Sequence, residues 1–340
     1  MDVVDDRVWD GFVADLADGH HEQTTRYGEL RREHGFDVDR VVIMQGNDVM
    51  GGAQVLVRSS PVGRFAHVYR APLVRGSDPL LCARVVAALE DRARAARWRS
   101  LRVDTFPSQI DARKALDRAA FVPTSTWTDR CISRACLLDV DRDSLFAAMT
   151  SKGRYNVRRA ERYGVEVRVG GLSDVPSFFE LHQGTAKHQG FPVFPESYFR
   201  DTLEVFGESG RAFLFMAYLG DVPIAAIFDM IVGRRMYYCW GGMDRRPHHA
   251  RTMANYLLHF RAMNVAREHG CVEYDLVGDS EFKRKLTDRV VPWPAPRRKF
   301  FGLLSSARER LFEYSGTRPR VRSLITRAVH RLGLEPTMPW

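Results

Sequence analysis

The stretch AFLFMAYLGDVPIAAIFDMIVGRRMYYCW, residues 212–240, decides the fold class. Turn signals at Gly220-Asp221 and Gly233-Arg234 separate three runs rich in β-branched and aromatic residues, 212–219, 222–231 and 236–240. Short apolar runs joined by glycine-containing turns are typical of antiparallel hairpins. The sequence therefore predicts a three-stranded antiparallel meander in the second half of the chain.

Helices and strands on both sides of this meander predict one α+β unit. Helical spacing and cap signals predict helices starting near Asp143 and covering 174–188, 196–206 and 252–269, and further strands are expected at 165–169 and 272–276. The first half has a similar order, with helices at 8–17, 23–34, 78–96 and 111–119 and strands at 41–44, 51–58, 65–69, 101–104 and 131–139. The simplest interpretation is a duplicated α+β unit, with domains at 1–142 and 143–296.

Residues 297–340 have a different composition. Between Arg297 and Arg331 there are ten Lys or Arg residues and two acids, Glu309 and Glu313, and apolar residues recur at helical spacing. One interpretation is a basic helical tail that packs back on the domains with its arginines in water. The other is a surface for an RNA backbone or an anionic membrane.

The composition excludes several classes of protein. The 340 residues carry 51 Lys and Arg against 42 Asp and Glu, and the net charge of +9 favours a polyanionic partner. No run approaches the roughly 18–20 apolar residues of a membrane span, and the acidic segment 1–18 does not have the pattern of a signal peptide. The five cysteines form no CxxC pair. We therefore expect a cytoplasmic protein without a disulfide framework or a zinc ribbon.

A further set of segments carries a resemblance. The stretch SKGRYNVRRAERYGV, residues 151–165, resembles the pattern S-K-x-R-x-N-I-R-K-A-x-K-x-G-V of the Fem family of aminoacyltransferases. In the same half, five segments are similar to further motifs of that family in the same order: 216–226, 237–242, 255–259, 270–278 and 281–283. The first half matches more loosely, through Gln23, Tyr27, Arg31 and GGAQVL at 51–56. The resemblance spans residues 8–285.

This resemblance implies two GNAT-like domains in tandem and transfer of an amino acid from aminoacyl-tRNA to an acceptor amine. The acceptor would be a peptidoglycan precursor or a peptide-like metabolite. Because the aminoacyl ester is already activated, alignment and stabilisation of the oxyanion suffice. The amine would attack the ester directly, with no cofactor, metal or covalent enzyme intermediate. The coiled-coil arm of FemA and FemB is absent, as in shorter FemX-like members.

Lys283 is the first candidate for catalysis. It follows the expected strand 272–276 and matches the family's lysine, which is thought to contact the carbonyl of the transferred group. It is also one of only six lysines in an arginine-rich chain. The alternative is a solvated lysine in the charge run 283–285. Asp275 can orient Lys283 or simply end its strand, and Asp104, which follows another strand, is open to the same two interpretations.

The resemblance also suggests where the acceptor and the tRNA bind. Arg31 and Tyr198 match acceptor-binding positions, and Tyr238, Trp240 and Tyr256 are candidates either for the cleft or for the core. Phe194 stands where the family has an arginine. This departure argues against a nucleotide-diphosphate acceptor and leaves a less phosphorylated acceptor, such as a peptide-like metabolite, as an alternative. The predicted tRNA-binding residues are Arg297, Arg298 and Lys299, and the basic tail is a candidate for contact with an anionic membrane. No metal is expected, because His248-His249 has no third ligand at suitable spacing.

Two other classes remain open. The CelD/BcsL-like group of acyl-CoA-dependent N-acyltransferases shares the tandem architecture, and its G-D-x-x-Y-K pattern is similar to GDSEFK at 278–283. A CoA pyrophosphate needs free backbone amides at a helix N-terminus. At the matching place, 245–250, Pro247 removes an amide and His248 replaces a glycine. The other class, a catalytically silent RNA- or membrane-binding module, leaves the Phe282-Lys283 motif unexplained.

Overall fold

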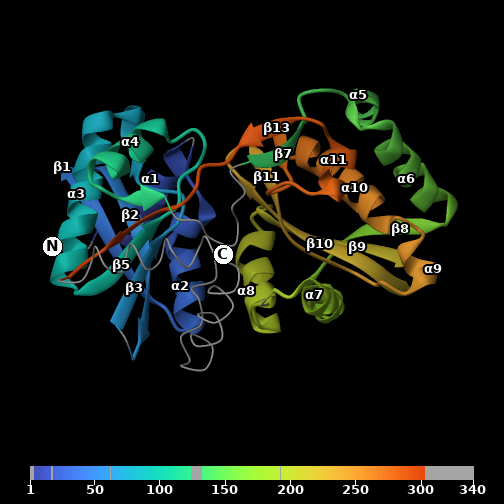
Figure 1. Ribbon diagram of the computed structural model, residues 1–340, viewed down its shortest axis with the longest axis horizontal. Helices are drawn as coiled ribbons and strands as arrows, with labels where there is room; N and C mark the ends of the chain where they lie inside the picture. The colour runs from blue at the N-terminus through green and yellow to red at the C-terminus, as the bar shows by residue number, and fades with distance from the viewer. Residues whose placement is uncertain (1–3, 17, 62, 124–131, 192, 303–340) are drawn as a thin grey trace. The chain divides into compact units, whose positions relative to one another are not determined.

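The computed structural model describes residues 4–16, 18–61, 63–123, 132–191 and 193–302 (Figure 1). The chain divides into two compact units. The first takes the described parts of Met1–Cys131 and Trp293–Trp340, and the second takes those of Ile132–Pro292. Each unit has its own sheet and its own hydrophobic core.

The sheet of the first unit is mostly antiparallel. Its strands are β1 (Asp37–Gln45), β2 (Asp48–Ser60), β3 (Gly63–Val68), β4 (Leu73–Val74), β5 (Trp98–Val103), β6 (Val122–Pro123) and β14 (Arg297–Phe300). The strand order is β1-β2-β3-β5-β14-β6, and β4 pairs with β2. Strands β3 and β5 run parallel, because the helix between them returns the chain to the same edge.

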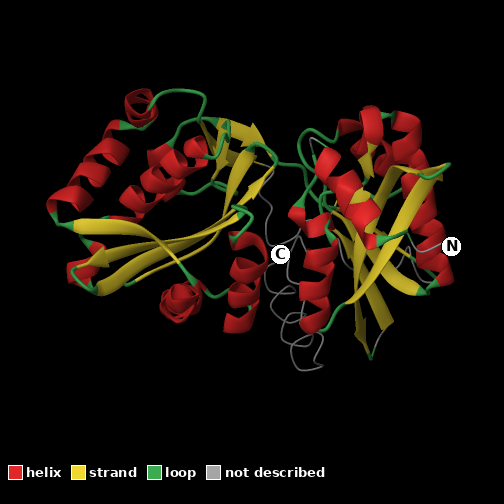
Figure 2. Ribbon diagram, turned by 180° about the vertical axis from the view of Figure 1, so that it is seen from behind, coloured by secondary structure: helices red, strands yellow, loops and turns green. Residues whose placement is uncertain are grey.

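Helices cover the first sheet, as the red helices against the yellow strands of Figure 2 show. They are α1 (Asp6–Asp15), α2 (Thr25–Glu33), α3 (Pro79–Ala95) and α4 (Ile110–Arg118), with 3₁₀ turns η1 (His21–Gln23) and η2 (Arg75–Ser77). The predicted start of α3 is confirmed: Asp78 caps it by accepting a hydrogen bond of 2.7 Å from the backbone N–H of Leu80. Val85 and Leu89 on its buried face join the core around Trp98.

The second sheet contains the predicted meander, which is confirmed as β9 (Ala212–Leu219), β10 (Val222–Val232) and β11 (Arg235–Met243). The other strands are β7 (Ile132–Leu137), β8 (Val165–Gly170), β12 (Glu273–Asp275) and β13 (Val290–Pro292). The order is β13-β7-β12-β11-β10-β9-β8, and β11 and β12 are parallel.

Two layers of helices enclose this sheet (Figure 1). On one face lie α5 (Arg142–Ala148), α6 (Ser151–Arg162), α10 (Ala254–Glu268) and α11 (Glu281–Leu286), and their apolar residues form one core with β9 and β10. The other face carries α7 (Val175–Gln189), preceded by η3 (Leu172–Asp174), and α8 (Glu196–Gly207). The short helix α9 (Pro247–Ala250) precedes α10. No helix in the described ranges has the length and apolar character to cross a bilayer.

Two strands belong to a different part of the fold from the one that the predicted boundaries gave them. Strand β7 falls within predicted domain 1–142, yet it pairs with β12 and β13 of the second sheet. Strand β14 falls within the predicted tail, yet it pairs with β5 and β6 of the first sheet. These corrections have one cause: strand pairing joins segments distant in sequence, whereas the predicted boundaries rested on local order alone. The expected helices of the tail lie outside the described residues.

Candidate active site

Lys283 is held at the end of strand β12. The chain leaves β12 through a turn in which Val277 and Gly278 both have positive φ, 50° and 99°. Ser280 then caps α11, and the Lys283 side chain folds back so that Nζ donates a hydrogen bond of 2.8 Å to the carbonyl oxygen of Val277. Lys283 is only 8% exposed. The alternative of a fully solvated lysine is therefore wrong.

Asp275 and Ser133 hold the turn on which Lys283 depends. Oδ1 of Asp275 accepts hydrogen bonds from Ser133 Oγ (2.5 Å) and from the backbone N–H of Val277 (2.7 Å). The Ser133 hydroxyl in turn accepts one of 2.8 Å from the N–H of Gly278. A β-branched residue at positive φ is strained, and these bonds fix it there. Burial, the largest cause, raises the pKa of Asp275 to about 6, although Lys283 and these hydrogen bonds oppose it.

Aromatic rings surround the same lysine. Its Nζ lies 5.4 Å from the ring centre of Tyr238, and the ring of the neighbouring Phe282 lies 4.8 Å from that of Tyr256. His259 of α10 packs edge-on against Tyr238 at 4.7 Å and against Phe282 at 5.3 Å. The structure thus brings together Tyr238, Tyr256 and Lys283. Sequence reasoning missed His259, whose pKa is lowered to about 3, first by burial and then by the charge of Lys283.

A buried hydrogen-bond chain continues from His259 into the sheet. Nδ1 of His259 lies 2.8 Å from the hydroxyl of Tyr274, and that hydroxyl donates a bond of 2.8 Å to Asp229 Oδ2. Asp229 is fully buried, and burial raises the pKa of its carboxyl well above the usual range. A carboxyl that stays protonated can take part in this chain without a buried charge. The sequence pointed to Asp229 in one way: it is the single acidic residue in the apolar strand 222–232.

A β-bulge separates two aromatic residues that the sequence analysis placed together. Phe228 pairs with Trp240 and Asp229 pairs with Tyr238, so Cys239 is the extra residue in β11. Without the bulge, residues two apart in a strand share a face. Here Tyr238 contacts α10 through His259, whereas Trp240 contacts α8 on the opposite face.

The Trp240 side of the sheet gathers a second aromatic group. The rings of Phe194 and Tyr198 stack at 4.1 Å, and Trp240 meets Tyr198 edge-on at 5.7 Å. Tyr198 is buried, while Phe194 and Trp240 are half-buried. Tyr198 and Trp240 therefore share an aromatic wall apart from Lys283. Phe194 extends this aromatic wall. An arginine at the same position, as in the resembled family, would instead offer a positive charge to a phosphate.

Arg31 and Asp104 belong to a buried charged cluster in the first unit. Arg31 is 2% exposed, and its guanidinium lies over the ring of Phe36 at 4.2 Å. Asp104 receives two hydrogen bonds from Arg102, of 2.9 and 3.2 Å, and lies 3.1 Å from His67 Nε2. Burial alone would raise the pKa of Asp104, but Arg102 and His67 outweigh burial and lower it. Asp104 is thus paired inside the first unit, whereas Asp275 supports the turn beside Lys283.

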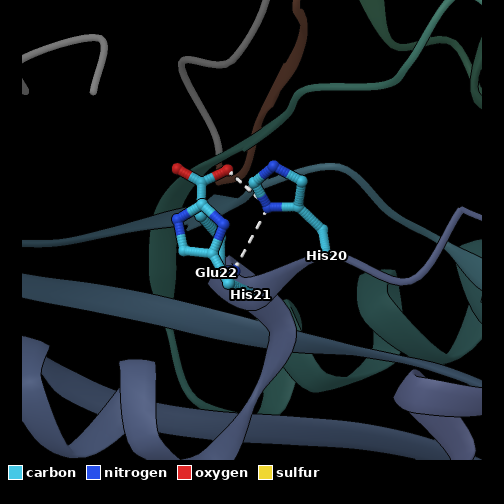
Figure 3. Close-up of side chains that lie close together, drawn as sticks. All are labelled: His20, His21 and Glu22. Atoms are coloured by element: carbon cyan, nitrogen blue, oxygen red, sulfur yellow. Dashed lines mark hydrogen bonds and ion pairs between the residues drawn. The ribbon is translucent and has the colours of Figure 1, made fainter. Parts of the chain in front are cut away.

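The same unit contains a candidate metal cluster that sequence reasoning missed. His20, His21 and Glu22 offer ligand atoms within 4.8 Å of one another (Figure 3). His20 Nδ1 lies 3.1 Å from Glu22 Oε2 and accepts a hydrogen bond from the backbone N–H of Glu22, and Arg70 lies 3.7 Å from the same carboxylate oxygen. Burial raises the pKa of Glu22 to about 7, although Arg70 opposes it. A guanidinium already supplies positive charge there, so the donor set does not fit a metal cation.

The other histidine pair of the sequence analysis is also accounted for. His249 is buried, and its Nδ1 lies 2.6 Å from Asp244 Oδ2, whereas His248 is exposed. Asp244 also accepts from Arg246 at 2.7 Å. This arrangement links α9 to the end of β11. It pairs the Asp244 carboxylate with the guanidinium of Arg246 and the imidazole of His249.

The three predicted tRNA-binding residues are engaged within the first unit. Arg297 makes two hydrogen bonds to Asp117, of 2.6 and 3.0 Å, and Lys299 pairs with Glu90. Arg298 is buried, and burial lowers its pKa to about 10. These residues form strand β14, so their side chains contact the fold. A role of the three residues in tRNA binding stays a prediction.

Known proteins share both the sequence pattern and the architecture. A family described as an acetyltransferase (GNAT) domain matches residues 151–284. The lipid II:glycine glycyltransferase of Staphylococcus haemolyticus is 23% identical over 232 residues, which are 65% of this chain and 55% of that protein. The Staphylococcus aureus protein of the same name is 22% identical over 222 residues, 62% and 53% of the two chains. The chain spans about half the length of the curated relatives it matches.

Solved structures agree on the fold. The crystal structure of FemX superposes with a TM-score of 0.75 at 18% identity and covers 92% of this chain and 98% of its own. The structure of L-PGS from Bacillus licheniformis gives a TM-score of 0.52 at 12% identity, with 94% and 99% covered. The predicted α+β class with two tandem GNAT-like domains is confirmed. The chain is thus similar in fold to FemX and, over 62–65% of its length, similar in sequence to the lipid II:glycine glycyltransferases.

Proposed function

We propose that this chain transfers an amino acid from aminoacyl-tRNA to an acceptor amine and forms an amide bond by direct attack. The observation that carries the proposal is the Lys283 ammonium, fixed against the Val277 carbonyl and 5.4 Å from the ring centre of Tyr238. The name of the relatives, lipid II:glycine glycyltransferase, supports transfer of an amino-acid residue and an acceptor of the lipid II type.

The chemistry divides into alignment and charge stabilisation. Holding the amine against the ester carbonyl contributes about 7–11 kcal/mol in favourable cases. The amine nitrogen bonds to the ester carbonyl carbon, the C–O bond to the tRNA ribose breaks, and the proton lost by the amine ends on the released ribose hydroxyl. The carbonyl oxygen becomes negative as the amine attacks, and one well-placed donor contributes about 3–4 kcal/mol. Lys283 is that donor in the proposal, and Asp275 is a positioning residue because it fixes the turn to which the lysine is bonded. Neither step requires a cofactor or a metal.

The acceptor is proposed to be a peptidoglycan precursor or a peptide-like metabolite. Tyr238 offers a ring beside the lysine, and Tyr256 packs against the neighbouring Phe282. Tyr198 and Trp240 form the aromatic wall on the other face, extended by Phe194. Stacked rings favour apolar or planar groups over a diphosphate, which supports an acceptor less phosphorylated than a nucleotide-linked precursor. Arg31 is proposed to bind the acceptor through its buried guanidinium.

The experiment is a test of donor choice. The purified chain is incubated with total tRNA charged with labelled amino acids and, in parallel, with labelled acetyl-CoA, each with a pool of candidate amines. RNase-sensitive transfer that falls in the Lys283→Ala variant and persists in the Lys285→Ala variant supports the proposal. Lys285 is the matched control, because its Nζ pairs only with exposed Glu281 in the described chain.

Two results would contradict the proposal. Transfer from acetyl-CoA that survives RNase would assign the chain to the acyl-CoA-dependent class. The four-residue helix α9 makes this outcome unexpected, since Pro247 stands at its start and leaves few free amides for a pyrophosphate. Absence of transfer from either donor to any amine, including lipid II, would favour a binding module.

A further inference from the structure

Helix α6 presents a basic surface to solvent. Its buried side consists of Gly153, Asn156, Val157 and Ala160, which face the core with α10. The residues that we call the α6 surface lie on the exposed side and at the helix end: Lys152, Tyr155, Arg158, Arg159, Arg162, Tyr163 and, from the segment after α9, Arg251. Tyr155 and Tyr163 are 45% and 39% exposed.

The cations of the α6 surface are not neutralised within the fold. Among the described residues, none of the five cations of this surface takes part in an ion pair, and Glu161 is the single acid of the helix. Some exposed arginines elsewhere are paired, for example Arg26 with Glu29 and Arg94 with Glu90 and Asp91. Unneutralised charge of one sign in one place attracts a polyanion.

Cations and rings alternate along this surface. Lys152 and Arg162 lie over the ring of Tyr155, at 5.0 and 5.7 Å, and Arg159 and Arg251 lie over that of Tyr163, at 5.6 and 5.8 Å. Positions 152, 155, 159 and 162 share one side of a helix. Basic residues interleaved with aromatic rings are the combination that binds phosphodiester backbones while bases stack on the rings.

We propose that the α6 surface binds the phosphodiester backbone of an RNA, and, resting on the proposed function, that this RNA is the aminoacyl-tRNA donor. A membrane surface is the less fitting partner, because an interfacial helix turns aliphatic residues outward. On α6 the aliphatic residues Val157 and Ala160 are buried, and the exposed positions are polar, charged or Tyr.

The α6 surface is physically connected to the candidate active site. The Thr150 hydroxyl donates a hydrogen bond of 2.7 Å to the backbone carbonyl of Lys285, two residues after Lys283 on α11. Gly153 packs so closely on that carbonyl that a side chain there would overlap it. RNA bound along α6 therefore lies on the helix that supports the Lys283 helix.

The experiment measures binding of the full chain to labelled, uncharged total tRNA at a series of salt concentrations. We expect the double variant Arg158→Gln/Arg162→Gln to bind about tenfold more weakly at low salt, with a salt slope smaller by about one per arginine. The double variant Arg26→Gln/Arg94→Gln removes the same charge from paired arginines and should bind as the wild type does. Tyr155→Leu should weaken binding, and Tyr155→Phe should restore it because the ring is kept.

The outcomes separate this inference from the proposed function. Equal tRNA binding by the wild type and both double variants would overturn the inference, even if transfer from aminoacyl-tRNA is observed. Loss of binding to phosphatidylglycerol vesicles in Arg158→Gln/Arg162→Gln, with tRNA binding unchanged, would overturn it in favour of a membrane. Binding of tRNA that depends on α6, without transfer from charged tRNA, would support the RNA surface and contradict the proposed function.

Discussion

The ammonium of Lys283 donates a hydrogen bond to the carbonyl oxygen of Val277, and so ties α11 back to the turn from which that helix starts. Val277 has a φ of 50°, which a β-branched residue rarely adopts. The position of the lysine therefore depends on the turn, and the turn depends on side chains from two strands, Ser133 of β7 and Asp275 of β12.

Replacing Lys283 with alanine is expected to lower the rate of transfer by about 10²–10³-fold, since one oxyanion donor contributes about that factor. Lys283→Met keeps the buried stem and should lower the rate as much with less loss of stability. The measurement is the single-turnover rate from charged tRNA, with circular dichroism to follow the fold. Turnover close to that of the wild type in Lys283→Met would remove the lysine from the mechanism.

Asp275 is expected to make stability depend on pH. The pKa of its carboxyl is raised in the folded chain to about 6, so the folded state holds the proton more tightly than the unfolded state does. The contribution of Asp275 to the free energy of unfolding is therefore fully present below about pH 4. This contribution decreases by about 2–3 kcal/mol as the pH rises through 6. The measurement is urea unfolding at pH 4.5 and 7.5.

Variants isolate the contribution of Asp275. Asp275→Asn cannot ionise, so its loss of stability over this pH range should be smaller than that of the wild type. Asp279→Asn is the matched control: hydrogen bonds from Arg284 and Arg134 lower the pKa of Asp279 to about 2, so its own contribution has the opposite sign and lies at lower pH. An identical pH dependence in the wild type and Asp275→Asn would contradict the raised pKa.

Gly153 is expected to tolerate no side chain, although it lies in a helix. A Cβ at this position would overlap the backbone carbonyl oxygen of Lys285, which cannot rotate away as a flexible side chain would. Gly153→Ala should therefore displace α11, lower the free energy of unfolding by about 1–3 kcal/mol and reduce the transfer rate. The measurements are urea unfolding and single-turnover transfer.

Gly184, in α7, supplies the matched comparison. A Cβ there would meet nothing within 4 Å, so Gly184→Ala should leave the transfer rate unchanged. It should raise stability by up to about 1 kcal/mol, because alanine is the better helix former. If Gly153→Ala behaved in the same way as Gly184→Ala, the close contact between α6 and α11 would be contradicted.

Local signals made much of the fold predictable. The meander of β9, β10 and β11 was predicted because its strands are joined by short glycine turns, and α3 because Asp78 and Pro79 mark its start. Strand β7 was assigned to the wrong domain and the residues of β14 to a helical tail, because the partners of both strands lie more than a hundred residues away in sequence. Pairing over such distances leaves no local pattern.

The candidate site was predictable from the sequence in the same way, where local motifs mark its residues and not where its geometry depends on strand pairing. Lys283, Asp275, Tyr238 and Tyr256 could be named from motifs, but the bulge at Cys239 that sends Trp240 to the opposite face could not. A bulge adds one residue without changing the apolar character of a strand, so hydrophobic alternation does not reveal it. His259 was missed because a histidine on an amphipathic helix gives no sign of its partners.

The hydroxyl of Tyr274 joins His259 to Asp229, and its removal is expected to have a large effect. Tyr274→Phe leaves an imidazole nitrogen and a carboxyl without their hydrogen-bond partner in a fully buried place, at a cost of about 2–5 kcal/mol. Asp229→Asn should cost less, because the native carboxyl is already neutral when its pKa is raised and an amide occupies the same volume. Thermal and urea unfolding measure the stability of both variants.

Since His259 packs against Tyr238 and Phe282 beside Lys283, Tyr274→Phe should also lower the transfer rate, whereas Asp229→Asn should preserve most of it. Equal stability of the two variants, or a larger loss in Asp229→Asn, would show that the carboxyl is ionised in the folded chain.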